Sequence, residues 1–360
     1  MSISPAWRYP ALLPLSWLYS GMVRLRNWCY ERKIFRTVRL SATVVSIGNL
    51  SVGGTGKTPT TALLANALVH CGLRVAIVAR GYRRKDKDAC IVSDGRGARA
   101  GLPNAGDEPL LLAQQCPQVP IVVARSKTRA AQVAVEKFRP EIILVDDGMQ
   151  HRRLQRDLEM VLLPASLMSP PAWLLPAGPL REPWSGLRRA QAIGITGVAD
   201  LTAAQKNDLY HFISQRSPAP IVLLDFVADH LASLRDDGNL PMAQLAQAKV
   251  LLVSGIAAPQ RFHRMAADLG AQIAGEIVYR DHHNYTRTDA GAIAKCFQNS
   301  NADLIITTAK DGIKLRLFES LLKLPVFILE IRARILPENL SALVSMMIEA
   351  SKKASQKPRF

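Results

Sequence analysis

The stretch V-V-S-I-G-N-L-S-V-G-G-T-G-K-T, residues 44–58, decides the fold class of this chain. Its β-branched start predicts a buried strand over residues 44–47, and the pattern that follows predicts a helix over residues 59–68. The turn between them is rich in glycine. Backbone N–H groups of such a turn, together with the positive end of the helix dipole, bind anions. The stretch therefore predicts a phosphate-binding loop.

This loop resembles the nucleotide-binding consensus G-x-x-x-x-G-K-[ST], with Ser51 where the first glycine belongs. We expect Lys57 to reach the β- and γ-phosphates and the Thr58 hydroxyl to lie on Mg²⁺. A loop with chance glycines is the alternative, but the strand, turn, lysine and threonine are all in register. The predicted ATP-phosphate site consists of Ser51, Val52, Gly53, Gly54, Thr55, Gly56, Lys57 and Thr58.

Length and composition limit the class of protein. With 360 residues the chain is long enough for two domains with sizeable cores. Its 48% hydrophobic and 21% charged residues are typical of a folded globular protein. The five cysteines are scattered without a C-x-x-C pair, which indicates a reducing compartment and argues against a disulfide framework or zinc site.

The charge balance is strongly basic and is uneven along the chain. The sequence has 46 Lys and Arg against 29 Asp and Glu, a net charge of +17. Residues 1–40 carry seven basic residues and one acid, and residues 351–360 carry four basic residues and no acid. Anionic lipid headgroups and nucleic acid are both partners that such ends would attract.

The N-terminal region favours lipid. Fifteen uncharged residues lie between Arg8 and Arg24, interrupted by two prolines, which is short of the roughly 20 that span a bilayer. No A-x-A-like cleavage site follows the basic start, so we expect no secretory signal. Tryptophans at 17 and 28 flank an apolar helical face, which predicts an amphipathic helix lying in a membrane interface. A helix packed on the protein's own core is the alternative. The apolar face consists of Leu15, Leu18, Tyr19, Met22 and Leu25.

Alternating elements predict the architecture. Apolar strands expected at 44–47, 75–78, 121–123, 142–145, 160–163 and 192–195 alternate with helical patterns at 58–70 and 127–138. This alternation predicts a mostly parallel sheet covered on both faces, with ligands at the carboxyl ends of its strands. A second α/β pattern runs from about 246 to 350, and residues 200–245 connect the two.

The predicted fold is therefore α/β, with a P-loop NTPase-like, mostly parallel sheet, a second, smaller α/β domain and an N-terminal amphipathic helix. The predicted boundaries are 1–40 for the membrane-interface segment, 41–225 for the nucleotide-binding domain, 226–350 for the C-terminal α/β domain and 351–360 for a basic tail.

Two acidic motifs are candidates for metal binding and catalysis. The run E-I-I-L-V-D-D-G (141–148) is an apolar strand that ends in two carboxylates, as in a Walker B element. Asp146 is the expected metal ligand, and Asp147 is able to face the metal or the nucleophile. In G-D-E-P (106–109), Asp107 and Glu108 fit a catalytic site and fit equally well a helix N-terminus, where acids are favoured.

The remaining motifs are weak one by one. H-R-R (151–153) and G-P-L-R-E-P (178–183) fit ordinary turns, and D-H-H-N-Y (281–285) fits a surface loop. T-T-A-K-D (307–311) follows a predicted strand but lacks the asparagine of the guanine-reading N-K-x-D element. GTP specificity is therefore poorly supported.

Taken in order, these motifs resemble those of the tetraacyldisaccharide 4′-kinase family of lipid A biosynthesis. The resemblance covers about residues 10–345 and includes S-V-G-G-T-G-K-T-P, R-G-Y (80–82), G-D-E-P, D-D-G-M-Q-H (146–151), G-P-L-R-E-P, D-H-H-N-Y and T-T-A-K-D. It implies ATP- and Mg²⁺-dependent transfer of the γ-phosphoryl group to the 4′-hydroxyl of an acylated glucosamine disaccharide 1-phosphate. It further implies a peripheral enzyme on the cytoplasmic face of the inner membrane of a Gram-negative-type bacterium, with no nucleic acid and no obligatory protein partner.

The resemblance also implies roles for individual residues. Asp107 would be the base that accepts the hydroxyl proton, oriented by His282 of the second domain, with Asp147 as its rival. Thr58 and Asp146 would arrange Mg²⁺, helped by Glu108. The candidates near the sugar, the lipid head or the nucleotide are Arg80, Tyr82, Arg125, His151, Arg181 and Glu182.

Two other functions compete with this one. A GTPase-like maturation factor would hydrolyse nucleotide without a lipid acceptor, and it would need the guanine-reading motif that the sequence lacks. A nucleic-acid-dependent ATPase would explain the charge of +17, and it would need aromatic residues interleaved with basic ones on a sheet. The sequence shows no such pattern.

Overall fold

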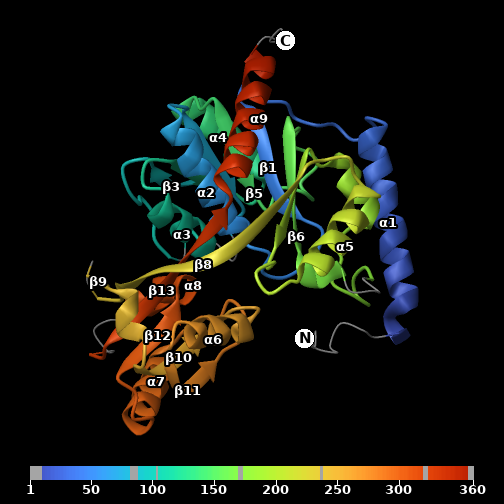
Figure 1. Cartoon of the computed structure of the whole chain (residues 1–360). Coiled ribbons are helices and arrows are strands. Elements are labelled where there is room, and N and C mark those ends of the chain that lie inside the picture. Colours follow the sequence, from blue (N-terminus) through green and yellow to red (C-terminus); the bar gives the residue numbers. More distant parts are fainter. Residues whose placement is uncertain are drawn as a thin grey trace. The chain divides into compact units, whose positions relative to one another are not determined.

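The computed structural model describes residues 10–81, 88–102, 104–168, 173–235, 238–318 and 323–355 (Figure 1). The chain forms two compact units. The first consists of Met1–Phe226 with Ala333–Phe360, and the second of Val227–Arg332. Strands β8 (Ile221–Ser233) and β13 (Val326–Ile335) each pass from one unit into the other.

The first unit contains a mostly parallel sheet. Its strand order is β8-β7-β6-β1-β5-β2-β4-β3, and only the β3–β4 pair is antiparallel among the described strands. Helical crossovers separate parallel neighbours, as parallel pairing requires. The expected α/β class is confirmed. The strands are β1 (Thr43–Asn49), β2 (Val75–Ala79), β3 (Cys90–Asp94), β4 (Pro120–Val123), β5 (Ile142–Asp146), β6 (Leu158–Pro164) and β7 (Ala192–Thr196).

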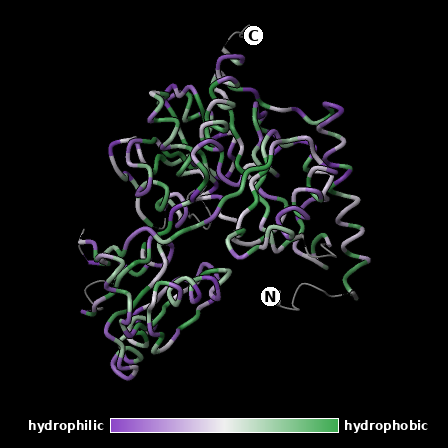
Figure 2. Tube along the Cα trace, in the orientation of Figure 1, coloured by the Kyte–Doolittle hydropathy of each residue, from purple (hydrophilic) through white to green (hydrophobic). Residues whose placement is uncertain are grey.

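Helices cover both faces of this sheet. Because strand side chains alternate between faces, Val45 of β1 packs in the core with α2, α3 and α9, while Val44 packs in the core with α4. Every residue of β1 is buried, and the green strands of Figure 2 show how apolar the layer is. The helices are α2 (Lys57–His70), α3 (Asp107–Gln115), α4 (Lys127–Phe138), α5 (Ala203–Ser214) and α9 (Pro337–Ser355).

Two parts of the chain differ from the sequence expectation. Residues 200–245 were expected to connect the halves with a short strand at 221–226, but they contain helix α5, and strand β8 continues to Ser233. The sequence grouped residues 333–350 with the second half, whereas Leu343, Val344 and Met347 of α9 are buried in the core of the first unit. Strand β13 carries the chain back to that unit, and the apolar face of α9 is buried there.

The second unit is smaller and has its own core. Its parallel strands follow the order β11-β10-β12-β13, and the short β9 (Asn239–Leu240) pairs antiparallel with β8. The second, smaller α/β unit expected from the sequence is thus confirmed. Its other strands and helices are β10 (Lys249–Ser254), β11 (Gln272–Val278), β12 (Leu304–Thr308), α6 (Pro259–Asp268), α7 (Arg287–Asn299) and α8 (Ala309–Leu315).

Helix α1 (Leu13–Glu31) is amphipathic, as expected. Ser16, Val23 and Asn27 are buried against the first unit. The outward side chains are large and apolar: Leu15, Trp17, Leu18, Met22, Leu25 and Trp28. Tyr19 differs from the expectation, because its hydroxyl donates to the backbone carbonyl of Arg181, 2.9 Å away, instead of joining the outward apolar face. Among the described helices, none combines the length and the hydropathy needed to cross a membrane.

Candidate active site

Parallel strands bring the predicted residues of the first unit to one edge of its sheet. Strands β1 and β5 are neighbours, with Ile47 paired to Asp146, so the phosphate-binding loop and the acid pair start side by side. Arg80 follows β2 and Arg125 follows β4 at the same edge. This is the carboxyl-terminal edge, where α/β sheets bind their ligands.

The phosphate-binding loop has the backbone that its glycines permit. Gly53 (φ 102°) and Gly56 (φ 77°) have positive φ, and among the described residues of this loop they alone do. A side chain on Gly56 would also overlap the ring of Phe226. Ser51 does not need the conformational freedom of glycine, which explains why the first consensus glycine is dispensable here.

The start of the loop is held by the segment between β6 and β7. Ser51 forms an antiparallel bridge with Leu180, and the Val52 N–H donates to the Pro179 carbonyl at 2.8 Å. Ser51 is only 1% exposed, so a small side chain fits there. These contacts fix the start of the loop independently of α2.

Lys57 and Thr58 of the loop lie beside the acid pair. Thr58 Oγ1 is 3.3 Å from Asp146 Oδ2, and Thr61 Oγ1 is 3.3 Å from Asp146 Oδ1. Lys57 Nζ lies 3.5 Å from Asp147 Oδ1. Thr61 was not predicted, although its spacing of three residues from Thr58 puts both hydroxyls on one helix face. The structure thus brings Lys57, Thr58, Asp146 and Asp147 together.

The two aspartates are electrostatically different. Burial, together with the nearby carboxylates of Glu108 and Asp147, raises the pKa of Asp146 to about 6, although the cations of Lys57 and Lys127 act in the opposite direction. Burial also acts to raise the pKa of Asp147, but Lys57, Lys127 and Arg181 outweigh it and lower that pKa. Negative charge is therefore poorly compensated at Asp146 and well compensated at Asp147.

The oxygen atoms around Asp146 fit a magnesium ion. Mg²⁺ prefers hard oxygen ligands and binds through one or two protein groups together with substrate phosphates. The Thr58 hydroxyl and the Asp146 carboxylate are such groups, and Glu108 lies close enough to influence Asp146. The part of the chain that the structure describes contains no cluster of three or more His, Cys, Asp or Glu able to hold a metal alone.

Lys127 is a site residue that the sequence did not reveal. It is 5% exposed, and its Nζ donates to the backbone carbonyl of Asp147. Asp147 has a positive φ of 52°, a conformation that a non-glycine residue keeps only when its surroundings hold it. Burial lowers the pKa of Lys127, and both aspartates oppose that change. The sequence offered no specific signal for it, because Lys127 is the first residue of α4, where a lysine is not unusual.

The basic candidates surround this centre from neighbouring loops. Arg80 and Arg125 are exposed, and the charge of Arg80 acts on Lys127 and on His151. Arg181 Nη1 lies 3.2 and 3.3 Å from the two carboxylate oxygens of Asp147. Tyr82 lies outside the described residues.

Asp107 and Glu108 begin helix α3 in the first unit. Both acids are in its first turn, where the helix dipole favours negative charge. Glu108 acts on the pKa of Asp146, so the start of α3 lies near the acid pair. The acids of G-D-E-P can therefore stabilise the N-terminus of α3 and also belong to the predicted active site.

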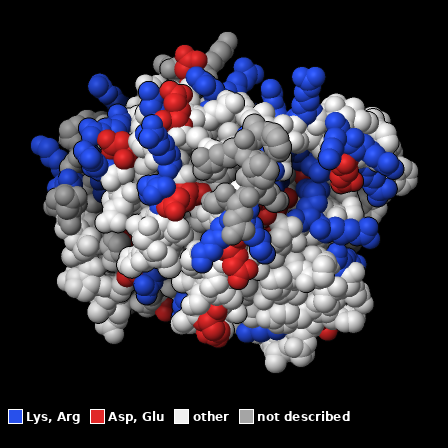
Figure 3. Space-filling model, turned by 90° about the horizontal axis from the view of Figure 1, so that it is seen from above, with Lys and Arg blue, Asp and Glu red and all other residues white. Residues whose placement is uncertain are grey.

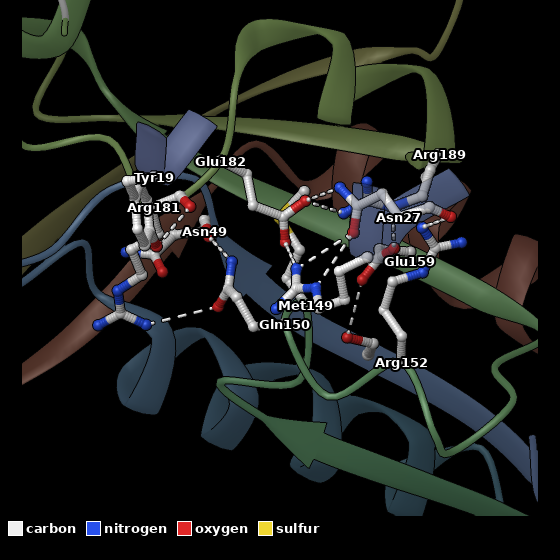
Figure 4. A network of polar contacts seen from close by, with 12 residues as sticks. Tyr19, Asn27, Asn49, Met149, Gln150, Arg152, Glu159, Arg181, Glu182 and Arg189 are labelled. Carbon is white, nitrogen blue, oxygen red and sulfur yellow. Dashed lines mark hydrogen bonds and ion pairs between the residues drawn. The ribbon is translucent and has the colours of Figure 1, made fainter. Parts of the chain in front are cut away.

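Unlike the exposed Arg80 and Arg125, Glu182 is fully buried and is bound by other side chains of the protein. Its side chain is 0% exposed and binds Asn27, Arg26 and Arg189 through its two oxygens (Figure 4). Burial acts to raise its pKa, but Arg189, Asn27 and Arg26 together lower it. Both carboxylate oxygens are engaged by the protein itself.

His282 belongs to the second unit, in the loop after β11. Its φ is 56°, and its N–H donates to the Gly255 carbonyl at 3.1 Å. The loop is fixed by the neighbouring motif, because Lys314 Nζ donates to the His283 carbonyl at 3.0 Å and buried Asp311 accepts from the Gly255 N–H at 2.9 Å. The motifs D-H-H-N-Y and T-T-A-K-D therefore form one cluster in this unit.

His151 is held in its neutral form. Its Nε2 lies 3.1 Å from Thr128 Oγ1 and accepts from the Thr128 N–H at 3.3 Å. Burial lowers its pKa to about 4, and the cations of Lys127 and Arg156 contribute. At neutral pH the ring is a hydrogen-bond partner without a charge.

This shift predicts how His151 titrates. Because its pKa is lower in the folded protein than in the unfolded chain (about 6.5), its contribution to stability is complete above about pH 6.5. That contribution is lost as the pH falls from 6.5 to about 4. We expect the His151 ring signal in NMR spectra to titrate near pH 4, with His151→Gln used for assignment. A midpoint near 6.5 in the folded protein would contradict this burial.

Comparison with known proteins identifies the family. Residues 8–349 match the family model described as tetraacyldisaccharide-1-P 4′-kinase (LpxK). A tetraacyldisaccharide 4′-kinase of Bdellovibrio bacteriovorus is 38% identical over 307 residues, 85% of this chain and 89% of that protein. One of Syntrophus aciditrophicus is 36% identical over 337 residues, 90% of this chain and 88% of that protein.

A solved structure agrees with these sequence matches. The crystal structure of LpxK from Aquifex aeolicus in complex with ATP superposes with a TM-score of 0.76 and 31% identity. The match covers 94% of this chain and 98% of that chain. The chain therefore belongs to the tetraacyldisaccharide-1-phosphate 4′-kinase family.

Proposed function

We propose that this protein transfers the γ-phosphoryl group of ATP to the 4′-hydroxyl of a tetraacylated glucosamine disaccharide 1-phosphate, a step of lipid A biosynthesis. The observation that carries this is the contact of Thr58 with Asp146 beside Lys57, in a chain that matches the kinase family over residues 8–349. No guanine-reading motif accompanies the loop, which disfavours the GTPase alternative.

The phosphate-binding loop holds ATP. The N–H groups of residues 53–56 and the N-terminus of α2 bind the phosphates, and Lys57 neutralises the charge that develops on the γ-phosphoryl group. Lys57 is already aimed at this edge of the sheet through its contacts with Thr55 (3.5 Å) and Asp147 (3.5 Å). Phosphoryl transfer depends on such positioning and charge neutralisation more than on covalent chemistry.

Mg²⁺ would be held by the Thr58 hydroxyl and the Asp146 carboxylate, with Glu108 assisting. When bound, the ion supplies charge neutralisation across the β- and γ-phosphates. Thr61 donates to the second oxygen of Asp146 and so orients that carboxylate. The surplus of negative charge at Asp146 is what makes the position attractive to a cation.

Asp107 acts as the base that accepts the proton of the 4′-hydroxyl, with His282 as its partner in proton transfer. Asp147 is less suited, because Lys57, Lys127 and Arg181 lower its pKa and a weaker base accepts a proton less readily. Its close pairing with Lys57 and Arg181 supports a role in organising these cations. The exposed Arg80 and Arg125, with Tyr82 and His151, bind the phosphate and sugar of the lipid head.

A transfer assay tests this function. The protein is incubated with γ-labelled ATP and Mg²⁺, with and without the tetraacyldisaccharide 1-phosphate, and the label is followed into the lipid fraction. We expect lipid-dependent labelling in proportion to the ADP formed. Label released only as inorganic phosphate, at the same rate with and without lipid, would favour a hydrolase instead.

We further propose that the protein is a peripheral enzyme on the cytoplasmic face of the inner membrane and that it binds the bilayer through the outer face of α1. Trp17 is 68% exposed and Leu18 is 63% exposed, and both lie on a helix followed by several arginines and lysines. Apolar side chains inserted at the headgroup level with basic residues beside them bind anionic bilayers. Figure 3 shows a face of the molecule on which lysine and arginine side chains predominate over acidic ones.

We expect the double substitution Trp17→Ser with Leu18→Ser to weaken binding to vesicles that contain anionic lipid. The loss of two large apolar side chains, each contributing about 1.5–3 kcal/mol when buried, predicts a reduction of at least about 100-fold. Cosedimentation with vesicles measures it. The control Tyr210→Ser alters an exposed aromatic residue of α5 and should leave binding unchanged. Equal binding of all three proteins would contradict the role of α1.

A further inference from the structure

Three side chains on the inner side of α1 bind one segment of the first unit. Ser16 Oγ donates to the Leu174 carbonyl at 2.8 Å, and Tyr19 Oη donates to the Arg181 carbonyl at 2.9 Å. Asn27 Nδ2 donates to Glu182 Oε2 at 3.0 Å. Figure 4 shows Tyr19 beside Arg181, and Asn27 directed at Glu182 together with Arg189. The inner side of α1 is thus matched to the residues around Arg181.

Glu182 makes this attachment rigid. A buried carboxylate is costly unless its oxygens are paired and hydrogen-bonded. Here Arg26 of α1 lies 3.3 Å from Oε1, and Arg189 lies 2.8 Å from Oε2. Because the protein itself engages both oxygens, Glu182 ties α1 to the residue next to Arg181 instead of binding a ligand.

The same segment continues directly into the nucleotide site. The Arg181 N–H donates to the Leu50 carbonyl at 2.6 Å, at the start of the phosphate-binding loop. The Arg181 guanidinium pairs with both oxygens of Asp147, the same carboxylate that Lys57 contacts. Because Arg181 already compensates part of the Asp147 charge, Asp147 attracts Lys57 less strongly. The Lys57 ammonium can then move more easily to the phosphates of ATP.

We propose that α1 is a positioning element of the active site: through Tyr19 and Glu182 it holds Arg181 on Asp147 and so keeps Lys57 available for ATP. This rests on the proposed function of the phosphate-binding loop and assigns Tyr19 and Glu182 as positioning residues. Since the outer face of the same helix is the proposed lipid surface, the segment 179–182 links that surface to the nucleotide site.

A double-mutant cycle tests the proposal on ATP affinity. Tyr19→Phe removes only the hydroxyl and keeps the ring, so the fold is preserved, and thermal unfolding verifies this. Loss of one hydrogen bond predicts ATP binding about fivefold weaker by calorimetry when Arg181 is present. In the Arg181→Ala background, Tyr19→Phe should change ATP affinity by less than about 1.5-fold, because its effect passes through Arg181.

A matched control is the removal of another hydroxyl from the same helix. Tyr30→Phe alters a partly buried ring that packs against Phe35 and Arg152, and it should leave ATP affinity unchanged. A Tyr19→Phe loss that is equal in both backgrounds, or no loss in either, would overturn the proposal. The cycle needs no lipid. A wild-type protein that binds ATP but phosphorylates no lipid would therefore count against the proposed function alone.

Discussion

Asp107→Ala should lower kcat for phosphoryl transfer to the lipid by about 10²–10⁴-fold while ATP still binds, because general-base catalysis contributes that much. Asp107 lies in the first turn of α3, outside the phosphate-binding loop, so its loss leaves the phosphate contacts in place. Steady-state kinetics with the tetraacyldisaccharide 1-phosphate, together with ATP calorimetry, measure the two effects separately.

The structural cost of this substitution is controlled by a second variant. A carboxylate at a helix N-terminus contributes about 0.3–1 kcal/mol to stability, so thermal unfolding of Asp107→Asn shows how much is lost with the charge. Asp200→Ala removes an exposed acid elsewhere in the first unit and should retain full activity. Near-normal turnover of Asp107→Ala would exclude it as the base and would make Asp147 the candidate.

The partnership of Asp107 with His282 is tested by combining their substitutions. If both residues serve one proton transfer, His282→Asn should cost little more once Asp107 is already alanine, as expected for groups that act as a unit. If the fold-loss in kcat of the double variant equals the product of the two single losses, His282 acts independently of Asp107.

Lys57→Met should reduce kcat/KM for ATP by about 10²–10³-fold, the usual cost of removing one donor that stabilises transition-state charge. The lysine lies at the start of α2 with its ammonium 3.5 Å from Asp147. A neutral side chain of similar length leaves the loop backbone intact but cannot compensate the phosphate charge. Coupled-enzyme measurement of ADP formation at several ATP concentrations gives the value.

The control for Lys57 is a lysine on the surface of the same unit. Lys137 of α4 is exposed and pairs only loosely with Glu136, at 3.7 Å, so Lys137→Met should keep near wild-type kinetics. Lys57→Met with kcat/KM within about threefold of wild type, well short of the loss expected for such a donor, would remove the lysine from phosphate binding.

The nucleotide site was predictable because its signals are local. A strand, a glycine turn and a helix that begins with Lys57 and Thr58 follow one another directly in the sequence. The pairing of this loop with Asp146 followed from the parallel sheet, since adjacent parallel strands end at one edge. The local sequence pattern was sufficient to predict the phosphate-binding loop, and the rule that adjacent parallel strands end at one edge was sufficient to place Asp146 beside it.

Other features depend on contacts between residues that are far apart in the sequence, and no local sequence pattern predicts them. Lys127 reads as an ordinary helix-start lysine, and only the structure shows its ammonium on the carbonyl of Asp147. Glu182 reads as part of an ordinary turn, yet its side chain is buried and accepts a hydrogen bond from Asn27 of α1, 155 residues earlier in the chain. Helix α9 was grouped with its sequence neighbours, because nothing local shows that β13 returns the chain to the first unit.

The most direct test is to locate the phosphate in the product. Wild-type protein, ATP, Mg²⁺ and the tetraacyldisaccharide 1-phosphate are incubated, and the lipid product is analysed by tandem mass spectrometry. We predict one added phosphate on the 4′-position of the sugar distal to the 1-phosphate, formed far more slowly when Lys57→Met replaces the wild type. A lipid that gains no phosphate while ATP is consumed, or one phosphorylated elsewhere, would contradict the assignment.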